Sequence, residues 1–314
     1  MRFAPYGVRV LNAQRNFTVF PDPASGLYNH RCDGFLSRTT TTGGNNDMRI
    51  NRVKKLWREG KPAVGGWLSI PHCVQAEVMA HTGLDWLCID MQHGCIDYSD
   101  TVPMLTAIST TNVMPFVRVP WNEPAMIMKV LDAGAYGVIV PMVSNRAEAE
   151  RAVGACRYPP VGMRSNGPNR VMLYAGSDYQ KHANDEVACI VMIETPEGIE
   201  KMDEIISTPG VDAAYIGPTD LALSLGLPPV MDNDEPKHVA TVNRILESCK
   251  RHNKIAGIHT ASSKFTQRYL DQGFQMVMLG TDRGGMSNYF KAEVGRLTGW
   301  TPLVPVGAPD KGGY

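Results

Sequence analysis

Eight short apolar segments, separated by stretches with helical character, limit the possible folds of this chain more than any other feature of its sequence. The segments are residues 63–70, 86–90, 114–119, 137–141, 189–194, 213–217, 255–258 and 276–280. Strands that are buried on both faces have continuous apolar sequences, and repeated alternation of strand and helix favours a closed parallel barrel over an open sheet. A hydrophobic content of 43% is enough for a sizeable core. The sequence therefore predicts an α/β fold of the (β/α)8 class, the TIM barrel.

Helices are predicted between these strands, at residues 74–81, 125–133, 146–156, 199–207, 238–252 and 264–272. Gly83, Gly134 and Gly273 come shortly after three of them, where glycine typically ends a helix. In a barrel of this class, the functional side chains follow the C-terminal ends of the strands. This rule separates candidate site residues from structural ones.

The barrel is assigned to residues 48–300, with an N-terminal extension at 1–47 and a C-terminal tail at 301–314. The extension contains several arginines, few acidic residues and no apolar core of the kind found in signal peptides. Its composition predicts a disordered segment. The alternatives are a transit peptide and translation that starts at Met48.

The charge balance favours a small-molecule partner over nucleic acid or a membrane surface. The chain has 31 basic and 31 acidic residues and a sequence pI of about 7.1, so it has no general attraction for polyanions. No apolar run approaches the roughly 20 residues that span a bilayer. The seven cysteines are scattered and contain no CxxC pair, which indicates reduced thiols in a cytoplasmic protein.

Two carboxylates follow neighbouring strands: Glu194 ends one apolar segment and Asp220 follows the next. Two such side chains would repel each other unless a hard divalent cation lay between them. The pattern therefore predicts a metal site. The alternative is that each acid only caps the helix that follows it, since acidic residues in a first turn complement the helix dipole.

Other polar residues follow other strands: Gln92, His93, Arg118 and His259. A metal at the carboxylate pair would act as a Lewis acid on a 2-oxo acid, and Arg118 would add donors to the developing oxyanion. Histidine has an ordinary pKa near neutrality, which suits His93 to move protons. The backbone amides around Thr219 are expected to hold the substrate carboxylate. His259 is interpreted as structural.

Other chemistries lack their usual sequence signals. No lysine occupies the C-terminal end of a predicted strand, and Lys254 precedes its strand, so an imine mechanism is not expected. The sequence also contains no GxxxxGK[ST] loop, no HExxH motif and no GxGxxG turn.

Ordered motifs over roughly residues 48 to 300 resemble those of the HpcH/HpaI aldolase family. They include Gly66-Trp67-Leu68-Ser69, Asp90-Met91-Gln92-His93, Pro115-Phe116-Val117-Arg118-Val119-Pro120, Leu131-Asp132-Ala133-Gly134-Ala135, Ile193-Glu194-Thr195 and Gly217-Pro218-Thr219-Asp220-Leu221. The spacing is also similar, with 25 residues from His93 to Arg118 and 26 from Glu194 to Asp220.

This resemblance implies a class II pyruvate aldolase, which cleaves 4-hydroxy-2-oxo acids to pyruvate and an aldehyde with Mg²⁺, Mn²⁺ or Co²⁺. Glu194 and Asp220 would be the metal ligands, Arg118 the residue that stabilises the enolate, and His93 the acid–base group. The residues expected to contact substrate are Trp67, Gln92, Gly217 and Thr219.

The resemblance also implies that Asp132 pairs with His93. Asp132 ends a predicted helix and precedes a strand, so it should lie at the opposite end of the barrel. The pair would then form between neighbouring subunits. A homo-oligomer, a trimer or hexamer that packs the last helix of each chain on a partner, is expected.

The chain departs from the family pattern at two places. Gln92 stands where many members have glutamate, and the segment Gly162-Met163-Arg164-Ser165 replaces a common Gly-Val-Arg-Gly. Two further functional hypotheses therefore remain open. One is related enolate chemistry, such as oxaloacetate decarboxylation or acyl-CoA lyase activity, and the other is a binding protein for small acids that has lost turnover.

Overall fold

Eight parallel strands form a closed barrel, which the computed structural model describes within residues 48–300. The strands are β1 (Ala63–Leu68), β2 (Trp86–Asp90), β3 (Met114–Arg118), β4 (Gly137–Val140), β5 (Ala188–Met192), β6 (Ala213–Ile216), β7 (Ile255–Ile258) and β8 (Met276–Thr281). Each strand pairs with the next along the chain, and β8 pairs with β1. The predicted TIM barrel is therefore confirmed. The predicted N-terminal extension at 1–47 and the predicted C-terminal tail at 301–314 lie outside the described residues.

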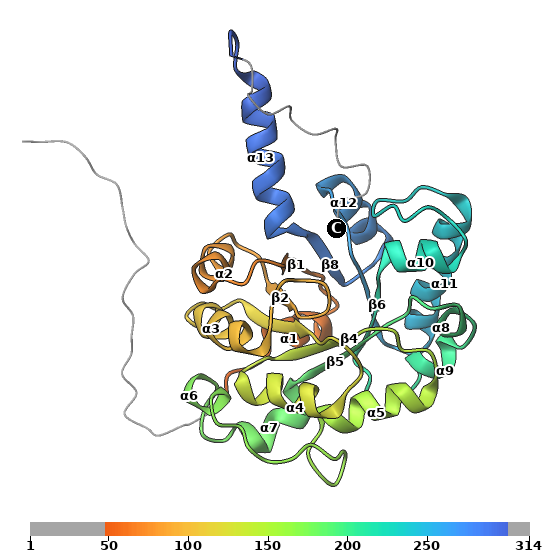
Figure 1. Ribbon diagram of the computed structural model, residues 1–314. Helices are drawn as coiled ribbons and strands as arrows, with labels where there is room; N and C mark the ends of the chain where they lie inside the picture. The colour runs from red at the N-terminus through yellow and green to blue at the C-terminus, as the bar shows by residue number, and fades with distance from the viewer. Residues whose placement is uncertain (1–47, 301–314) are drawn as a thin grey trace, which may run out of the picture. The chain divides into compact units, whose positions relative to one another are not determined.

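Helices surround these strands (Figure 1). They are α1 (Arg52–Arg58), α2 (Cys73–Ala80), α3 (Tyr98–Ser109), α4 (Pro124–Ala133), α5 (Arg146–Cys156), α6 (Val171–Ala175), α7 (Tyr179–Glu186), α8 (Pro196–Glu200), α9 (Met202–Ile206), α10 (Pro218–Ser224), α11 (Pro236–Arg251), α12 (Ser263–Gln272) and α13 (Asp282–Arg296). Gly134 and Gly273 occupy C-caps at φ of 120° and 98°, as their positions in the sequence predicted. Within residues 48–300, no helix is long and apolar enough to cross a membrane.

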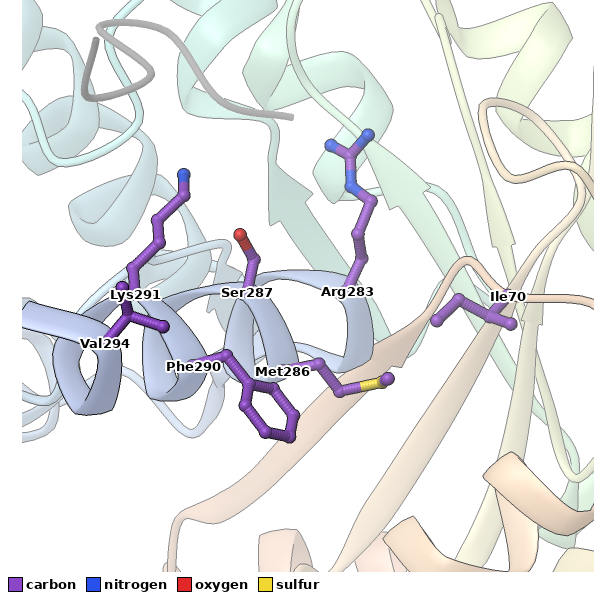
Figure 2. Close-up of a pocket in the computed structure, with 7 residues that line it drawn as sticks. All are labelled: Ile70, Arg283, Met286, Ser287, Phe290, Lys291 and Val294. Carbon is purple, nitrogen blue, oxygen red and sulfur yellow. The ribbon is translucent and has the colours of Figure 1, made fainter. Parts of the chain in front are cut away.

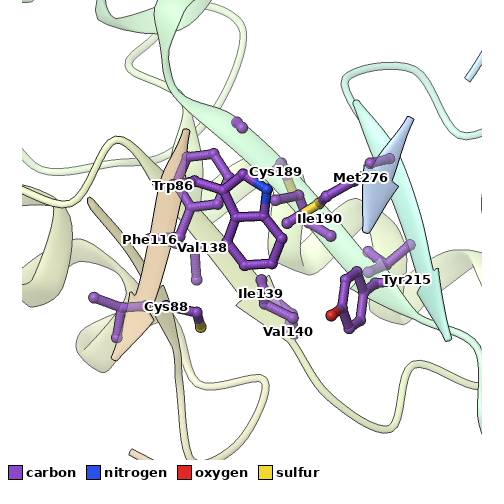
Figure 3. Close-up of a cluster of buried hydrophobic side chains, with 14 of the residues drawn as sticks. Trp86, Cys88, Phe116, Val138, Ile139, Val140, Cys189, Ile190, Tyr215 and Met276 are labelled. Carbon is purple, nitrogen blue, oxygen red and sulfur yellow. The ribbon is translucent and has the colours of Figure 1, made fainter. Parts of the chain in front are cut away.

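Large side chains fill the barrel interior where glycines on neighbouring strands leave room (Figure 3). A Cβ atom at Gly65 would lie 2.0 Å from the ring of Trp86, and one at Gly137 would lie 2.7 Å from Phe116. Trp86 and Phe116 stack with their ring centroids 5.9 Å apart. Large aromatic side chains packed against glycines fill the interior, so the barrel is a packed core. The space for a ligand lies at the end of the barrel.

Two predicted boundaries differ from the structure in ways that affect the site. The strand predicted at 189–194 ends at Met192, so Glu194 lies in the loop that follows β5. The single helix predicted at 199–207 is two short helices, α8 and α9, because Lys201 between them leaves the helical conformation at φ −99° and ψ 17°. Glu194 is therefore held by the loop after β5 rather than by the strand ladder itself.

Candidate active site

Asp90 and Arg118 form a buried ion pair at the ends of β2 and β3, where they are partners in the strand register. The Nε and Nη2 atoms of Arg118 donate to the two carboxylate oxygens of Asp90 at 2.8 and 2.6 Å. Burial alone would raise the pKa of Asp90, but these hydrogen bonds and the charge of Arg118 lower it. Because a guanidinium carries five N–H donors, the pair leaves Arg118 with further donors for a ligand.

Asp90 also shapes the loop that carries Gln92 and His93. The backbone N–H groups of Gln92 and His93 donate to Asp90 Oδ1 at 3.1 and 3.3 Å, which forms a turn of the Asx type. The side chain of His93 is exposed, whereas Gln92 Oε1 is buried and has no hydrogen-bond partner. An unpaired buried acceptor is unfavourable in the absence of a ligand or water, so Gln92 is suited to contact one.

Aromatic side chains pack beneath this ion pair. Trp67 on β1 stacks on Tyr215 with centroids 5.8 Å apart, and the guanidinium of Arg118 lies 5.0 Å from the Trp67 ring. The rings of His259 and Trp67 meet in a T-shaped arrangement, with their centroids 4.7 Å apart. Burial, and then the charge of Arg118, lower the pKa of His259 to about 3. His259 is therefore neutral near pH 7 and packs as an aromatic ring.

Glu194 is a nearly fully buried carboxylate, with 2% of its surface exposed. Its Oε1 accepts the backbone N–H of Met142 at 3.0 Å, whereas Oε2 is buried and has no partner. Burial raises the pKa of Glu194 to about 7, and the negative charge of Asp220 adds to this shift. The side chain is thus held in an arrangement that a cation would stabilise.

Asp220 lies in the first turn of α10, which begins directly after β6. Gly217, the N-cap of that helix, leaves the space that Glu194 occupies: a Cβ at Gly217 would lie 2.4 Å from Glu194 Oε2. Thr219 is half-buried in the same turn. The structure therefore places Glu194, Gly217, Thr219 and Asp220 at one end of the barrel, together with the ends of β2 and β3.

The residues present fit a hard divalent cation. Within the described residues no group of three or more His, Cys, Asp or Glu side chains gathers into a metal cluster. A closed cluster is not required, because Mg²⁺ and similar ions are commonly held by one or two carboxylates, with water and substrate oxygens as the other ligands. The unpaired Oε2 of Glu194 and the nearby charge of Asp220 match that pattern.

Asp132 lies at the other end of the barrel, near the end of α4 and before β4. Its Oδ1 accepts from Nη2 of Arg164 at 2.7 Å, and Arg164 is itself buried against the rings of Tyr158 and Tyr179. Since His93 follows the C-terminal end of β2, a single chain does not bring Asp132 to His93.

Asp90 and Met142 were not among the site residues predicted from the sequence. Asp90 had an available signal, because it is an acid at the last position of β2 and the same rule that selected Arg118 applies to it. Met142 contributes a backbone N–H from a loop in the left-handed conformation, at φ 58°. No property of a methionine side chain indicates this role in a sequence.

Comparisons with known proteins identify the family that this chain resembles. Residues 64–288 match the family described as HpcH/HpaI aldolase/citrate lyase. A hydroxypyruvate/pyruvate aldolase of Rhizorhabdus wittichii is 43% identical over 238 residues, which cover 76% of this chain and 95% of that protein. A 5-keto-4-deoxy-D-glucarate aldolase of Escherichia coli is 34% identical over 242 residues, or 76% of this chain and 94% of the relative.

A solved structure of an HpcH/HpaI aldolase/citrate lyase family protein from Burkholderia cenocepacia superimposes with a TM-score of 0.74. It is 32% identical, and the match covers 78% of this chain and 98% of that one. These similarities confirm the predicted resemblance and the expectation of an enzyme of the aldolase and lyase class. The chain belongs to the HpcH/HpaI aldolase/citrate lyase family.

Proposed function

We propose that this protein is a metal-dependent aldolase that reversibly cleaves a 4-hydroxy-2-oxo acid to pyruvate and an aldehyde. The observation that carries the proposal is the buried carboxylate of Glu194, whose Oε2 has no partner and whose pKa is raised by burial and by Asp220. Such a carboxylate is unfavourable without a cation. The hydroxypyruvate/pyruvate aldolase from Rhizorhabdus wittichii supports a three-carbon oxo acid as the product.

The residues that would hold the metal are Glu194 and Asp220. When bound, Mg²⁺, Mn²⁺ or Co²⁺ would supply Lewis acidity to the carboxylate and carbonyl oxygens of the oxo acid. Arg118, fixed by its two hydrogen bonds to Asp90, directs its remaining N–H donors at the oxygen on which negative charge develops. Trp67 lies against the guanidinium and limits its movement.

His93 moves the proton in this scheme. It takes the proton of the C4 hydroxyl, directly or through a water molecule, as the C3–C4 bond breaks and the aldehyde leaves. The electron pair of that bond forms the enolate, and return of a proton to C3 gives pyruvate. Gln92, Gly217 and Thr219 contact the substrate. His93 pairs with Asp132 of a neighbouring copy, because the two lie at opposite ends of one barrel.

The proposal therefore includes a homo-oligomer, a trimer or hexamer. Beyond its first turn α13 extends away from the barrel, and Asp282 is its buried residue (Figure 1). Met286 and Phe290, one turn apart, lie with Ile70 along an apolar groove of about 450 Å³ (Figure 2). Phe290 is 61% exposed. An apolar surface of this kind is commonly covered by a partner, here a second copy.

Replacing Phe290 by glutamate should break the oligomer. The charge would be buried in the contact between copies, so the variant should elute at the mass of a single chain in size-exclusion chromatography with light scattering. Lys250→Glu is the control, because it introduces the same residue at an exposed position on α11 that does not line the groove. A monomeric wild type would refute the oligomer.

The function is tested by measuring pyruvate release from a panel of 4-hydroxy-2-oxo acids, with oxaloacetate and acyl-CoA thioesters as comparison substrates. We expect activity that is lost with EDTA, restored by Mg²⁺, Mn²⁺ or Co²⁺, and absent in Glu194→Ala. Glu197→Gln, an exposed acid on α8 that pairs with Lys201, serves as control and should keep full activity. Aldol cleavage that survives both EDTA and Glu194→Ala would reject the proposal.

A further inference from the structure

The loop after β4 adopts an unusual backbone conformation where it meets the site. Met142 has φ of 58°, in the left-handed region that non-glycine residues rarely occupy. In this conformation its N–H donates to Glu194 Oε1 at 3.0 Å. A rare conformation at a site persists only where the surroundings stabilise it, so some contact must hold Met142 in place.

A directional series of hydrogen bonds supplies that contact. The hydroxyl of Ser144 donates to the carbonyl oxygen of Met142 at 3.2 Å, and it lies 2.8 Å from the hydroxyl of Thr195. A hydroxyl has one proton, so Thr195 donates to Ser144 while Ser144 donates to Met142. Thr195 Oγ1 in turn accepts the N–H of Gly198, in the first turn of α8. Bonds in such a series polarise one another.

The series links two loops that follow neighbouring strands. Val140 and Val191 are partners in the register of β4 and β5, and Ser144 and Thr195 lie beyond them. Thr195 is the residue next to Glu194 in the chain. The contact between Ser144 and Thr195 therefore ties the loop that carries Glu194 to the loop whose Met142 N–H binds it. The backbone N–H of Ser144 is separately bound to Glu148 Oε2 at 2.7 Å, which leaves its hydroxyl for this purpose.

We propose that Ser144 is a positioning residue for the metal site. Its hydroxyl holds Met142 in the left-handed conformation, in which the Met142 N–H donates to Glu194 Oε1. Glu194 Oε2 then remains available for the cation. The proposal rests on the metal site under the proposed function and adds a residue that touches neither metal nor substrate. Contacts of this kind that orient a metal ligand typically change metal affinity 10- to 100-fold when removed.

The test is a titration of the metal-free full-length protein with Mn²⁺, followed by electron paramagnetic resonance, in the absence of substrate. Ser144→Ala should bind Mn²⁺ roughly 10-fold more weakly than wild type, at the low end of that range because one of several contacts is removed. The matched control is Ser207→Ala, which removes a helix-end hydroxyl bonded to Glu204 O on α9 and should leave the affinity unchanged.

A second substitution separates positioning from a general loss of structure. Glycine adopts positive φ without strain, so Met142→Gly in the Ser144→Ala background should recover much of the lost affinity, to within about threefold of wild type. Should the alanine variant fold poorly, Ser144→Thr and Ser144→Val form a pair of similar shape that differs in the hydroxyl. The threonine variant should then bind Mn²⁺ more tightly.

Equal Mn²⁺ affinity in Ser144→Ala and wild type would refute the positioning role alone. The same conclusion follows if the double variant binds no better than Ser144→Ala. If wild type itself binds no Mn²⁺, both the proposed metal site and the role of Ser144 are refuted.

Discussion

The two ends of this barrel carry similar charged residues but treat them differently. At the N-terminal end, Asp212 accepts hydrogen bonds from Arg157 and from the backbone N–H of Cys189, each at 2.8 Å, and pairs with Lys54 at 2.8 Å. Burial would raise the pKa of Asp212, but the charges of Lys54 and Arg157 lower it. At the C-terminal end, Glu194 keeps one unpaired oxygen, and its pKa is raised to about 7.

This contrast separates charges that stabilise the fold from charges that serve a ligand. A buried carboxylate with cationic partners contributes to stability in the ligand-free protein, whereas one without them is unfavourable until a cation binds. Substitutions at the two ends should therefore have opposite effects on activity and on stability.

Glu194→Gln should give the largest effect on activity. Loss of a metal ligand should lower kcat/KM by at least about 100-fold, comparable to the removal of a group that stabilises the transition state. Without metal at pH 8, the same variant should be more stable than wild type, because a buried uncompensated charge is gone. Steady-state kinetics and urea unfolding would check both. A variant that is both active and less stable would contradict the contrast.

Asp212→Asn should lower stability and leave activity unchanged, the reverse of Glu194→Gln. Removing one partner of a buried ion pair leaves Arg157 without its counter-charge, so the free energy of unfolding should fall by about 3 kcal/mol. The kcat of the protein that remains folded should be unchanged, because Asp212 lies at the end of the barrel away from the site. Urea unfolding and kinetics under the same buffer conditions would measure this. A large fall in kcat with no change in stability would disprove it.

Arg118→Lys should have a smaller effect on activity than loss of Glu194. An ammonium group cannot form the two parallel hydrogen bonds that Arg118 makes with Asp90 and still direct donors at the substrate. We expect kcat to fall by roughly 10- to 100-fold with a modest change in KM. Stopped-flow measurement of pyruvate release would test this, and an unchanged kcat would assign Arg118 a purely structural role.

The pH dependence of metal binding should be the smallest effect. In the metal-free folded protein Glu194 titrates near pH 7, against an ordinary value of 4.5. Between these values the folded state holds a proton that the unfolded state has released, so stability decreases as pH rises through this window. Because metal must displace that proton, Mn²⁺ affinity should rise about tenfold per pH unit below 7 and level off above it.

Calorimetric titrations with Mn²⁺ at pH 5.5, 6.5, 7.5 and 8.5 would show this dependence. A constant affinity across the series would indicate that Glu194 is not the group that competes with the metal. Glu197→Gln should follow wild type, because Glu197 is an exposed acid.

The barrel could be predicted because the strands are separate apolar runs, most of them buried on both faces. Helices α1, α3, α6, α7 and α13 were not predicted. Of these, α3 contains Pro103, and α13 contains Gly284 and Gly285, which lower the helical propensity of both segments. The geometry of the surrounding barrel outweighed the low helical propensity of α3. Capping at Thr281 outweighed that of α13.

The candidate site could be predicted in part. Glu194, Asp220, Arg118 and His93 were selected because they follow strands, and the structure places all four at one end of the barrel. Contacts between distant segments could not be predicted, such as the bond between Arg164 and Asp132. The same holds for the role of Met142, because a backbone N–H has no side-chain signature.

The most direct test of the metal site is a crystal grown with Mn²⁺ and pyruvate, measured for anomalous scattering at a wavelength where manganese absorbs. The account predicts one strong anomalous peak bonded to Glu194 Oε2 and to a carboxylate oxygen of Asp220, at roughly 2.0 to 2.3 Å. A well-ordered pyruvate with no anomalous peak between these side chains would contradict it.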